Sequence, residues 1–196
     1  MASCYLEFRG SRMISEADNE TAVIAATRQW LERAVIGLNL CPFARAPHVR
    51  GQVRFVVSGA TNIDALAEDL ASELNFLAEA DPEQVETTLL IHPQVLGDFL
   101  AYNDFLDVAD AVVEGLELDG VIQVASFHPQ YQFADTAADD IENFSNRSPY
   151  PTLHLIREDS LSRVIDSIDD PDAIYERNIE RLRALGRAGW DALWRD

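Results

Sequence analysis

The residues with the most chemical potential lie between Phe127 and His154. This segment carries two histidines, His128 and His154, among carboxylates, amides, hydroxyls and one guanidinium. Imidazoles transfer protons near neutral pH and bind metal ions. Tyr131 adds a phenol hydroxyl. We therefore take His128, His154 and Tyr131 as candidate catalytic residues.

The same segment could hold an anionic group. Arg147 is the only basic residue between positions 55 and 156, and a guanidinium fits a carboxylate or a phosphate. Amide and hydroxyl side chains nearby would add hydrogen bonds. The expected partner is therefore a small anionic molecule. The expected binding residues are Arg147, Asn143, Asn146 and Ser148.

Cys41 is the remaining catalytic candidate. Its string Cys41-Pro42-Phe43 is similar to the glutaredoxin turn, in which a helix begins at the cysteine and lowers the thiol pKa. Here the cysteine ends a predicted helix, so we expect no such effect. Cys41, His128 and His154 together would give a divalent metal ion three ligands and leave one position open. Haem is the second cofactor alternative.

Each candidate also has a structural explanation. Histidines satisfy strand ends and cores, arginines pair with nearby carboxylates, and asparagines form turns. Tyrosine packs in cores, and a buried cysteine is a common core residue. The sequence leaves these alternatives open. His92 and His48 are not included in the expected site.

The predicted elements would bring the candidates to one edge of a sheet. Apolar periodicity predicts four helices and four strands in a single α/β domain. Strand–helix alternation predicts three parallel strands with right-handed crossovers, plus a fourth strand of open direction, flanked by helices. Ligands bind beyond the carboxyl ends of such strands. We expect His128 and His154 to share a pocket there, with Arg147 pointing into it and Cys41 beside it. The predicted strands are 53–58, 87–91, 121–127 and 152–156, and the predicted helices are 22–38, 63–77, 99–116 and 171–194.

Composition excludes several functions. The net charge of −19 argues against nucleic acid and anionic membranes as partners. All 15 basic residues are arginine, so Schiff-base chemistry and a P-loop lysine are excluded. The sequence contains no stretch of 18 apolar residues, so it predicts no membrane-spanning helix.

Two cysteines and the lack of an apolar leader favour the reducing cytoplasm. Residues 1–12 show no period, so we expect a poorly ordered extension, with Met13 as an alternative start and 13–196 as the domain.

Several short sequence segments, found in the same order along the chain, carry a resemblance to a known family. The chain resembles the bacterial and plant "domain of unknown function 1415" family from about Ala22 to the last helix. That resemblance implies no particular reaction, but it marks seven candidates as motif positions: Cys41, His128, Tyr131, Asn143, Asn146, Arg147 and His154. The matching strings are Trp30-Leu31, Leu38 to Ala44, Asn103 to Leu106, Phe127 to Phe133, Asn143, Asn146 to Pro151 and Leu153 to Glu158.

Two functions fit these residues. The first is a small-molecule enzyme, with or without a metal ion, that uses histidine chemistry on an anionic substrate in a pocket formed by residues 127–154. The alternative is a protein that binds a metal ion, haem or a small anion without turnover.

Overall fold

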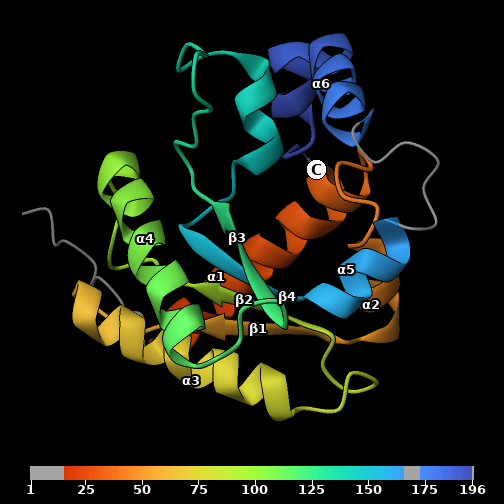
Figure 1. The fold of residues 1–196 in the computed structure, drawn as a ribbon. Coiled ribbons are helices and arrows are strands. Elements are labelled where there is room, and N and C mark those ends of the chain that lie inside the picture. The colour runs from red at the N-terminus through yellow and green to blue at the C-terminus, as the bar shows by residue number, and fades with distance from the viewer. Residues whose placement is uncertain (1–15, 166–172, 196) are drawn as a thin grey trace, which may run out of the picture.

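The computed structural model describes residues 16–165 and 173–195. The extension expected at residues 1–12 lies outside the described residues. Within these ranges one open sheet is covered by helices on both faces (Figure 1).

The sheet has four strands in the order β1-β2-β4-β3. The strands are β1 (Val53–Val57), β2 (Thr87–Ile91), β3 (Ile122–Phe127) and β4 (Thr152–Arg157). β1 and β2 pair in parallel, whereas β4 is antiparallel to both β2 and β3. The α/β class is confirmed, but the sheet is mixed: of the three strands predicted to be parallel, only β1 and β2 pair in parallel, because β4 lies between β2 and β3. β4 lies between β2 and β3 and pairs along both of its edges. Its Leu153 and Leu155 are fully buried.

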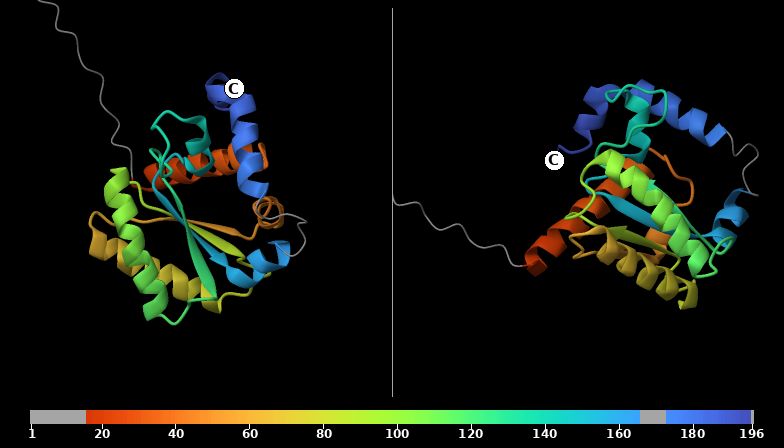
Figure 2. Two further views of the ribbon diagram at one scale, coloured as in Figure 1. Left: turned by 45° about the horizontal axis from the view of Figure 1, so that its top comes forward. Right: turned by 60° about the vertical axis from the view of Figure 1, so that its left-hand side comes forward.

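Two amphipathic helices cover one face of the sheet (Figure 2). They are α3 (Ile63–Glu79) and α4 (Phe99–Gly115). Side chains cap their first turns, since Asn62 Oδ1 accepts from Ala65 N and Asp98 Oδ1 accepts from Ala101 N, each at 3.0 Å. The leucines of α3 and the aromatic side chains of α4 pack on this face against Leu153 and Leu155 to form the larger core.

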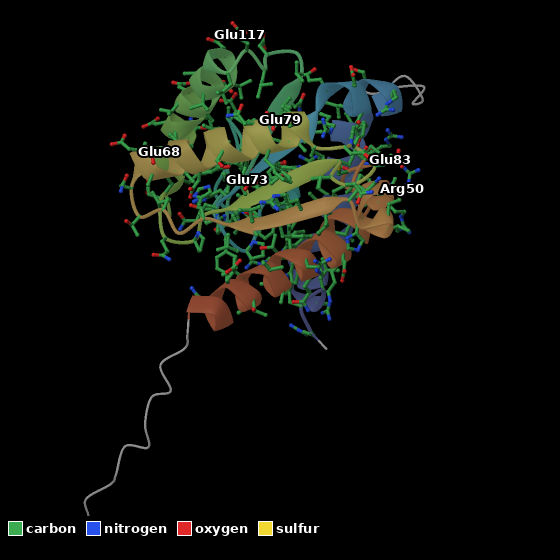
Figure 3. The ribbon with its side chains drawn as sticks, turned by 90° about the horizontal axis from the view of Figure 1, so that it is seen from below. Arg50, Glu68, Glu73, Glu79, Glu83 and Glu117 are labelled. Carbon is green, nitrogen blue, oxygen red and sulfur yellow. The ribbon has the colours of Figure 1, made fainter. Side chains whose placement is uncertain are left out.

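The stretch of sequence that contains this layer carries the excess negative charge of the protein. Residues 55–146 hold 19 of the 34 acidic residues and none of the 15 arginines, so the remainder of the chain is balanced at 15 of each. Figure 3 shows acidic side chains of α3 and of the turn after α4, with Glu68, Glu79 and Glu117 labelled. The −19 charge is therefore concentrated in one part of the molecule.

The opposite face is covered by helices from the two ends of the chain (Figures 1 and 2). They are α1 (Glu16–Trp30), its π-helical continuation η1 (Leu31–Ile36) and α6 (Ala173–Ala192), with the 3-10 helix η2 (Ile141–Asn146) packed on α6. Trp30, Leu182 and Trp190 lie in the core on this side.

Periodicity placed η1 inside the predicted helix 22–38 but missed three other short elements. They are η2, α2 (Arg45–Arg50) and α5 (Glu158–Ile165). Each has at most eight residues, too few to show two turns of a repeating apolar face. Within the described ranges, no helix combines the length and apolar character that crossing a membrane requires.

Candidate functional site

The long loop between β3 and β4 uses its polar side chains to hold itself together. The Asn143 side chain is fully buried, and its Oδ1 accepts from Phe133 N at 3.0 Å and from Thr136 Oγ1 at 2.8 Å. Its Nδ2 donates to Ala137 O at 2.8 Å. All three bonds stay inside the loop, so this amide orders the loop.

Asn146 and Ser148 have similar local bonds. Asn146 Nδ2 donates to Ser126 O at 3.2 Å, which ties the loop to the end of β3. Ser148 Oγ donates to Tyr150 O at 2.6 Å. These two predicted binding residues therefore close turns around the sheet edge.

Arg147 also serves the loop. Its Nε donates to Tyr131 O at 3.2 Å and its Nη2 to Ala138 O at 2.5 Å. Its guanidinium carbon lies 4.3 Å from the centre of the Phe144 ring, which Arg187 also contacts at 5.1 Å. Burial lowers the pKa of Arg147, and the charge of Arg187 lowers it further. The structure thus places this guanidinium on loop carbonyls and an aromatic ring.

His128 lies on the α3–α4 face and is fully buried. Its Nδ1 accepts from Gln130 N at 3.0 Å, and its Nε2 therefore carries the proton that it shares with Leu96 O at 3.2 Å. Burial lowers the pKa of this imidazole. Phe99, which lies 5.4 Å from His128 between ring centres, also packs on Tyr131 at 5.2 Å. Both candidate residues are parts of a packed aromatic cluster.

His154 lies on the opposite face of the sheet. Its neighbours in β4, Leu153 and Leu155, point into the α3–α4 core, so strand alternation turns His154 toward the α1 face. There its ring centre lies 6.1 Å from that of Phe127. The structure therefore does not bring His128 and His154 into one pocket.

A hydroxyl fixes the tautomer of His154. Thr87 Oγ1 donates its single proton to Leu155 O at 2.6 Å. It can then only accept from His154 Nε2, which lies 2.7 Å away. Nδ1 is left as an unprotonated acceptor with no partner in the described part of the chain. Burial lowers the pKa of His154 to about 4, so the ring is neutral at physiological pH.

A cavity of about 1020 Å³ lies on this α1 face and is lined by both His154 and Cys41. Its wall includes Trp30 and Leu31, where α1 passes into η1. Thr87, the first residue of β2, also lines it. The cavity therefore extends toward the amino ends of β1 and β2, rather than toward the carboxyl ends that the sequence indicated.

Two features of the backbone set the position of Cys41. In η1 the helix widens, with Gly37 N bonded to Glu32 O at 2.9 Å and Leu40 N to Val35 O at 2.8 Å. A Cβ on Gly37 would lie 2.2 Å from Arg33 O, so this position requires glycine.

Helix α6 then fixes the carbonyls that follow η1. Asn178 Nδ2 donates to Leu40 O at 2.8 Å, and Arg181 Nη1 donates to Asn39 O at 2.9 Å and to Leu38 O. The three residues before Cys41 are thus held from the other end of the chain.

The thiol of Cys41 is free and partly exposed. Burial raises its pKa, while hydrogen bonds from the backbone amides of Phe43 and Ala44 act in the opposite direction. Cys41 follows η1, and the short helix α2 begins four residues later at Arg45, with Ala44 as its N-cap. Sequence analysis missed α2 because it has a single turn and a half and no buried residue.

The three residues expected to bind a metal ion do not meet. Cys41 and His154 line the cavity, but His128 lies beyond the sheet. Among the described residues, no group of three or more His, Cys, Asp or Glu side chains could hold an ion.

Sequence reasoning also missed Thr87 and Gln52. Gln52 is 5% exposed and lines the cavity. Its Nε2 donates to Glu83 O at 3.0 Å and Pro82 O at 3.3 Å, which fixes the orientation of the amide. The sequence offered one indication of these residues, which is their position along the predicted strands. Gln52 directly precedes the first predicted strand, and Thr87 begins the second.

Comparison with known proteins identifies a family. The family model described as "Protein of unknown function (DUF1415)" matches residues 22–192. No curated protein and no solved structure matches the chain. The match covers most of the 196 residues, which includes every described element except the first turns of α1. The chain therefore belongs to the DUF1415 family.

Proposed function

We propose that the protein is a small-molecule enzyme whose substrate binds in the cavity lined by Cys41 and His154. One observation carries this proposal: a thiol and an imidazole with a free nitrogen line the same cavity of about 1020 Å³. Cavities of this size suit metabolite-sized ligands. The walls contributed by Trp30, Leu89 and Phe127 would take an apolar body.

The two groups have separate roles in this proposal. His154 Nδ1 accepts a proton or a hydrogen bond from the substrate, and Thr87 keeps the ring oriented. Cys41 supplies sulfur as a nucleophile once its proton has been removed. Burial leaves both groups neutral in the free protein. Ionisation of the thiol or of the imidazole must therefore occur after the substrate has bound.

The expectation of an anionic substrate is not part of this proposal. It depended on Arg147, Asn143, Asn146 and Ser148, which bond to the loop itself. We keep the cytoplasm as the proposed location, because a thiol that lines a binding cavity needs a reducing compartment.

A second candidate function is binding without turnover. The shifted pKa values favour it, because no charged side chain contributes to that of Cys41 or His154. Enzymes usually place a charged partner beside their acid, base or nucleophile, and that charge tunes its pKa.

Ligand screening separates the two functions. Wild-type protein, Cys41→Ser and His154→Gln would be tested against a metabolite collection by thermal shift, and each stabilising compound would be incubated with protein and followed by NMR. Tyr175→Phe on α6, where Tyr175 is 53% exposed, is the matched control.

The enzyme predicts conversion that is lost in both cavity variants and kept in the control. Binding that depends on either residue, without conversion, would support the second candidate. If no compound stabilises wild type more than the cavity variants, the cavity is not the site and both candidates fail.

A further inference from the structure

Two acceptors without protein partners reach the same cavity. Among the described residues, the fully buried side-chain atoms that lack a partner are Thr88 Oγ1, His92 Nε2 and Arg157 Nε. His154 Nδ1 and Gln52 Oε1 also accept no hydrogen bond from this part of the chain, but they are not sealed in. Both residues line the cavity, and neither of these two atoms is among the fully buried ones.

Neither acceptor can turn into a donor without breaking another bond. Nε2 of Gln52 holds two carbonyls of the loop before β2, so flipping the amide would set oxygen against oxygen. Nε2 of His154 donates to Thr87 Oγ1, so moving its proton to Nδ1 would leave the Thr87 oxygen without that donor. The chain therefore fixes the polarity of both groups before any ligand binds.

The charges at the cavity do not favour an anion either. Arg157 Nη2 is already bonded to Leu77 O at 2.6 Å and Ala80 O at 2.7 Å, at the end of α3. The other lining arginines, Arg50 and Arg163, are exposed at the surface; Figure 3 labels Arg50 and Glu83 at this end of the molecule. Four carboxylates line the same cavity: Asp81, Glu83, Glu86 and Asp159.

We propose that the ligand is an apolar molecule that carries an N–H or O–H donor and no negative charge, and that either His154 Nδ1 or Gln52 Oε1 accepts that donor. This inference rests on the proposed function, since it defines the class of molecule for the same cavity. An aromatic or aliphatic alcohol, amine or amide belongs to this class. A carboxylate or phosphate would place its oxygens against two fixed acceptors.

Isosteric probes test the donor requirement. Indole and benzofuran have nearly the same shape, but only indole has an N–H. The pair 2-naphthol and 2-methoxynaphthalene differs in the same way, and 2-naphthoate supplies the anion. We expect wild type to bind each donor about 2- to 10-fold more tightly than its partner, as one net hydrogen bond implies, and to bind 2-naphthoate least well. NMR titration gives the dissociation constants.

Variants assign the preference to the two acceptors. Of Gln52→Met and His154→Phe, the variant that removes the acceptor used by the donor should lower the ratio of the two constants toward one, while Tyr175→Phe keeps the wild-type ratio. Thr87→Val is nearly isosteric and frees His154 to place its proton on Nδ1. That variant should therefore gain relative affinity for benzofuran, which would be visible even if Gln52→Met folded poorly.

The outcomes separate a failure of this inference from a failure of the proposed function on which it rests. Equal binding of donor and donor-free probes, or tighter binding of 2-naphthoate, would overturn the inference and leave the cavity as a binding site. If none of the probes binds, or if binding is unaffected by every cavity variant, the proposed function fails and the inference fails with it.

Discussion

Burial of imidazoles couples the stability of this protein to pH. Burial lowers the pKa of both His154 and His92 to about 4, whereas an imidazole in an unfolded chain titrates near 6.5. Below pH 6.5 the unfolded state therefore binds protons that the folded state does not. This contribution to stability is complete above about pH 6.5 and is lost as the pH falls toward 4.

His154→Gln isolates one of these contributions. We expect the difference in unfolding free energy between wild type and this variant to shrink by roughly 3 kcal/mol at most between pH 7 and pH 4. Urea unfolding at pH 7, 5.5 and 4 measures it, and Tyr175→Phe should show a constant difference. A constant difference for His154→Gln as well would mean that His154 titrates alike in both states.

For single residues, the sequence predicted which side chains were candidates better than it predicted which groups they contact. Cys41 and His154 were singled out, and both line the cavity. His128 and Arg147 were singled out on equal grounds, yet they hold the loop and the aromatic cluster. A motif looks the same in the sequence whether its side chains bind a ligand or bind the backbone. Only the structure distinguishes the two cases, because it shows on which face of the sheet each side chain lies.

The widened helix η1 is the element that brings the Cys41 turn to the cavity. Gly37→Ala would place a methyl group 2.2 Å from Arg33 O, and the backbone would have to open to avoid it. We expect a loss of about 1–3 kcal/mol in unfolding free energy, together with faster alkylation of Cys41.

Gly115→Ala is the matched control, because a Cβ at the end of α4 meets no atom within 4 Å. It should leave stability unchanged or raise it by up to about 1 kcal/mol. Chemical denaturation and iodoacetamide labelling in a Cys4→Ser background provide both measurements. Equal effects of the two substitutions would show that the π-helical turn does not require glycine.

Helix α6 holds the same turn through side chains. Arg181→Gln removes the bonds to the carbonyls of Leu38 and Asn39. We expect Cys41 to react several-fold faster with iodoacetamide, with a change in stability below about 1 kcal/mol, because an exposed arginine contributes little to the core.

Arg183→Gln, on the same helix, serves as its control. Arg183 pairs with Glu142 at 2.8 Å and does not bond to the turn, so its loss should leave the alkylation rate of Cys41 unchanged. An unchanged rate in Arg181→Gln as well would show that η1 alone positions the turn.

For the elements, periodicity identified every long helix and every strand, because each presents a repeating apolar face. It could not give the neighbours of β4, because the pattern within one strand does not say which strands pair with it. The placement of β4 depends on contacts between distant segments, and these do not appear in local pattern.

For the whole molecule, charge is distributed unevenly. The excess of 19 carboxylates lies in residues 55–146, and in the α3 layer only Glu73 has an arginine partner, Arg54 at 2.8 Å. Repulsion within this layer should weaken the fold at low ionic strength and be screened by salt.

The variant Glu68→Gln/Glu79→Gln tests this distribution. Both side chains are exposed on α3. We expect a higher Tm than wild type at 20 mM NaCl and little difference at 500 mM, where the Debye length is only a few ångströms. A pair of acidic residues outside the layer, Glu176→Gln/Glu180→Gln on α6, should give a smaller rise. Equal rises would mean that only total charge matters.

The position of β4 also governs the order in which the molecule can assemble. β2 and β3 make no ladder with each other and are joined only through β4. During synthesis β2 and β3 leave the ribosome before β4, their common partner, so each keeps an unpaired edge until residue 157 has emerged. Unpaired edges recruit other chains. The acidic layer on α3 and α4, complete by then, would keep nascent chains apart during that interval.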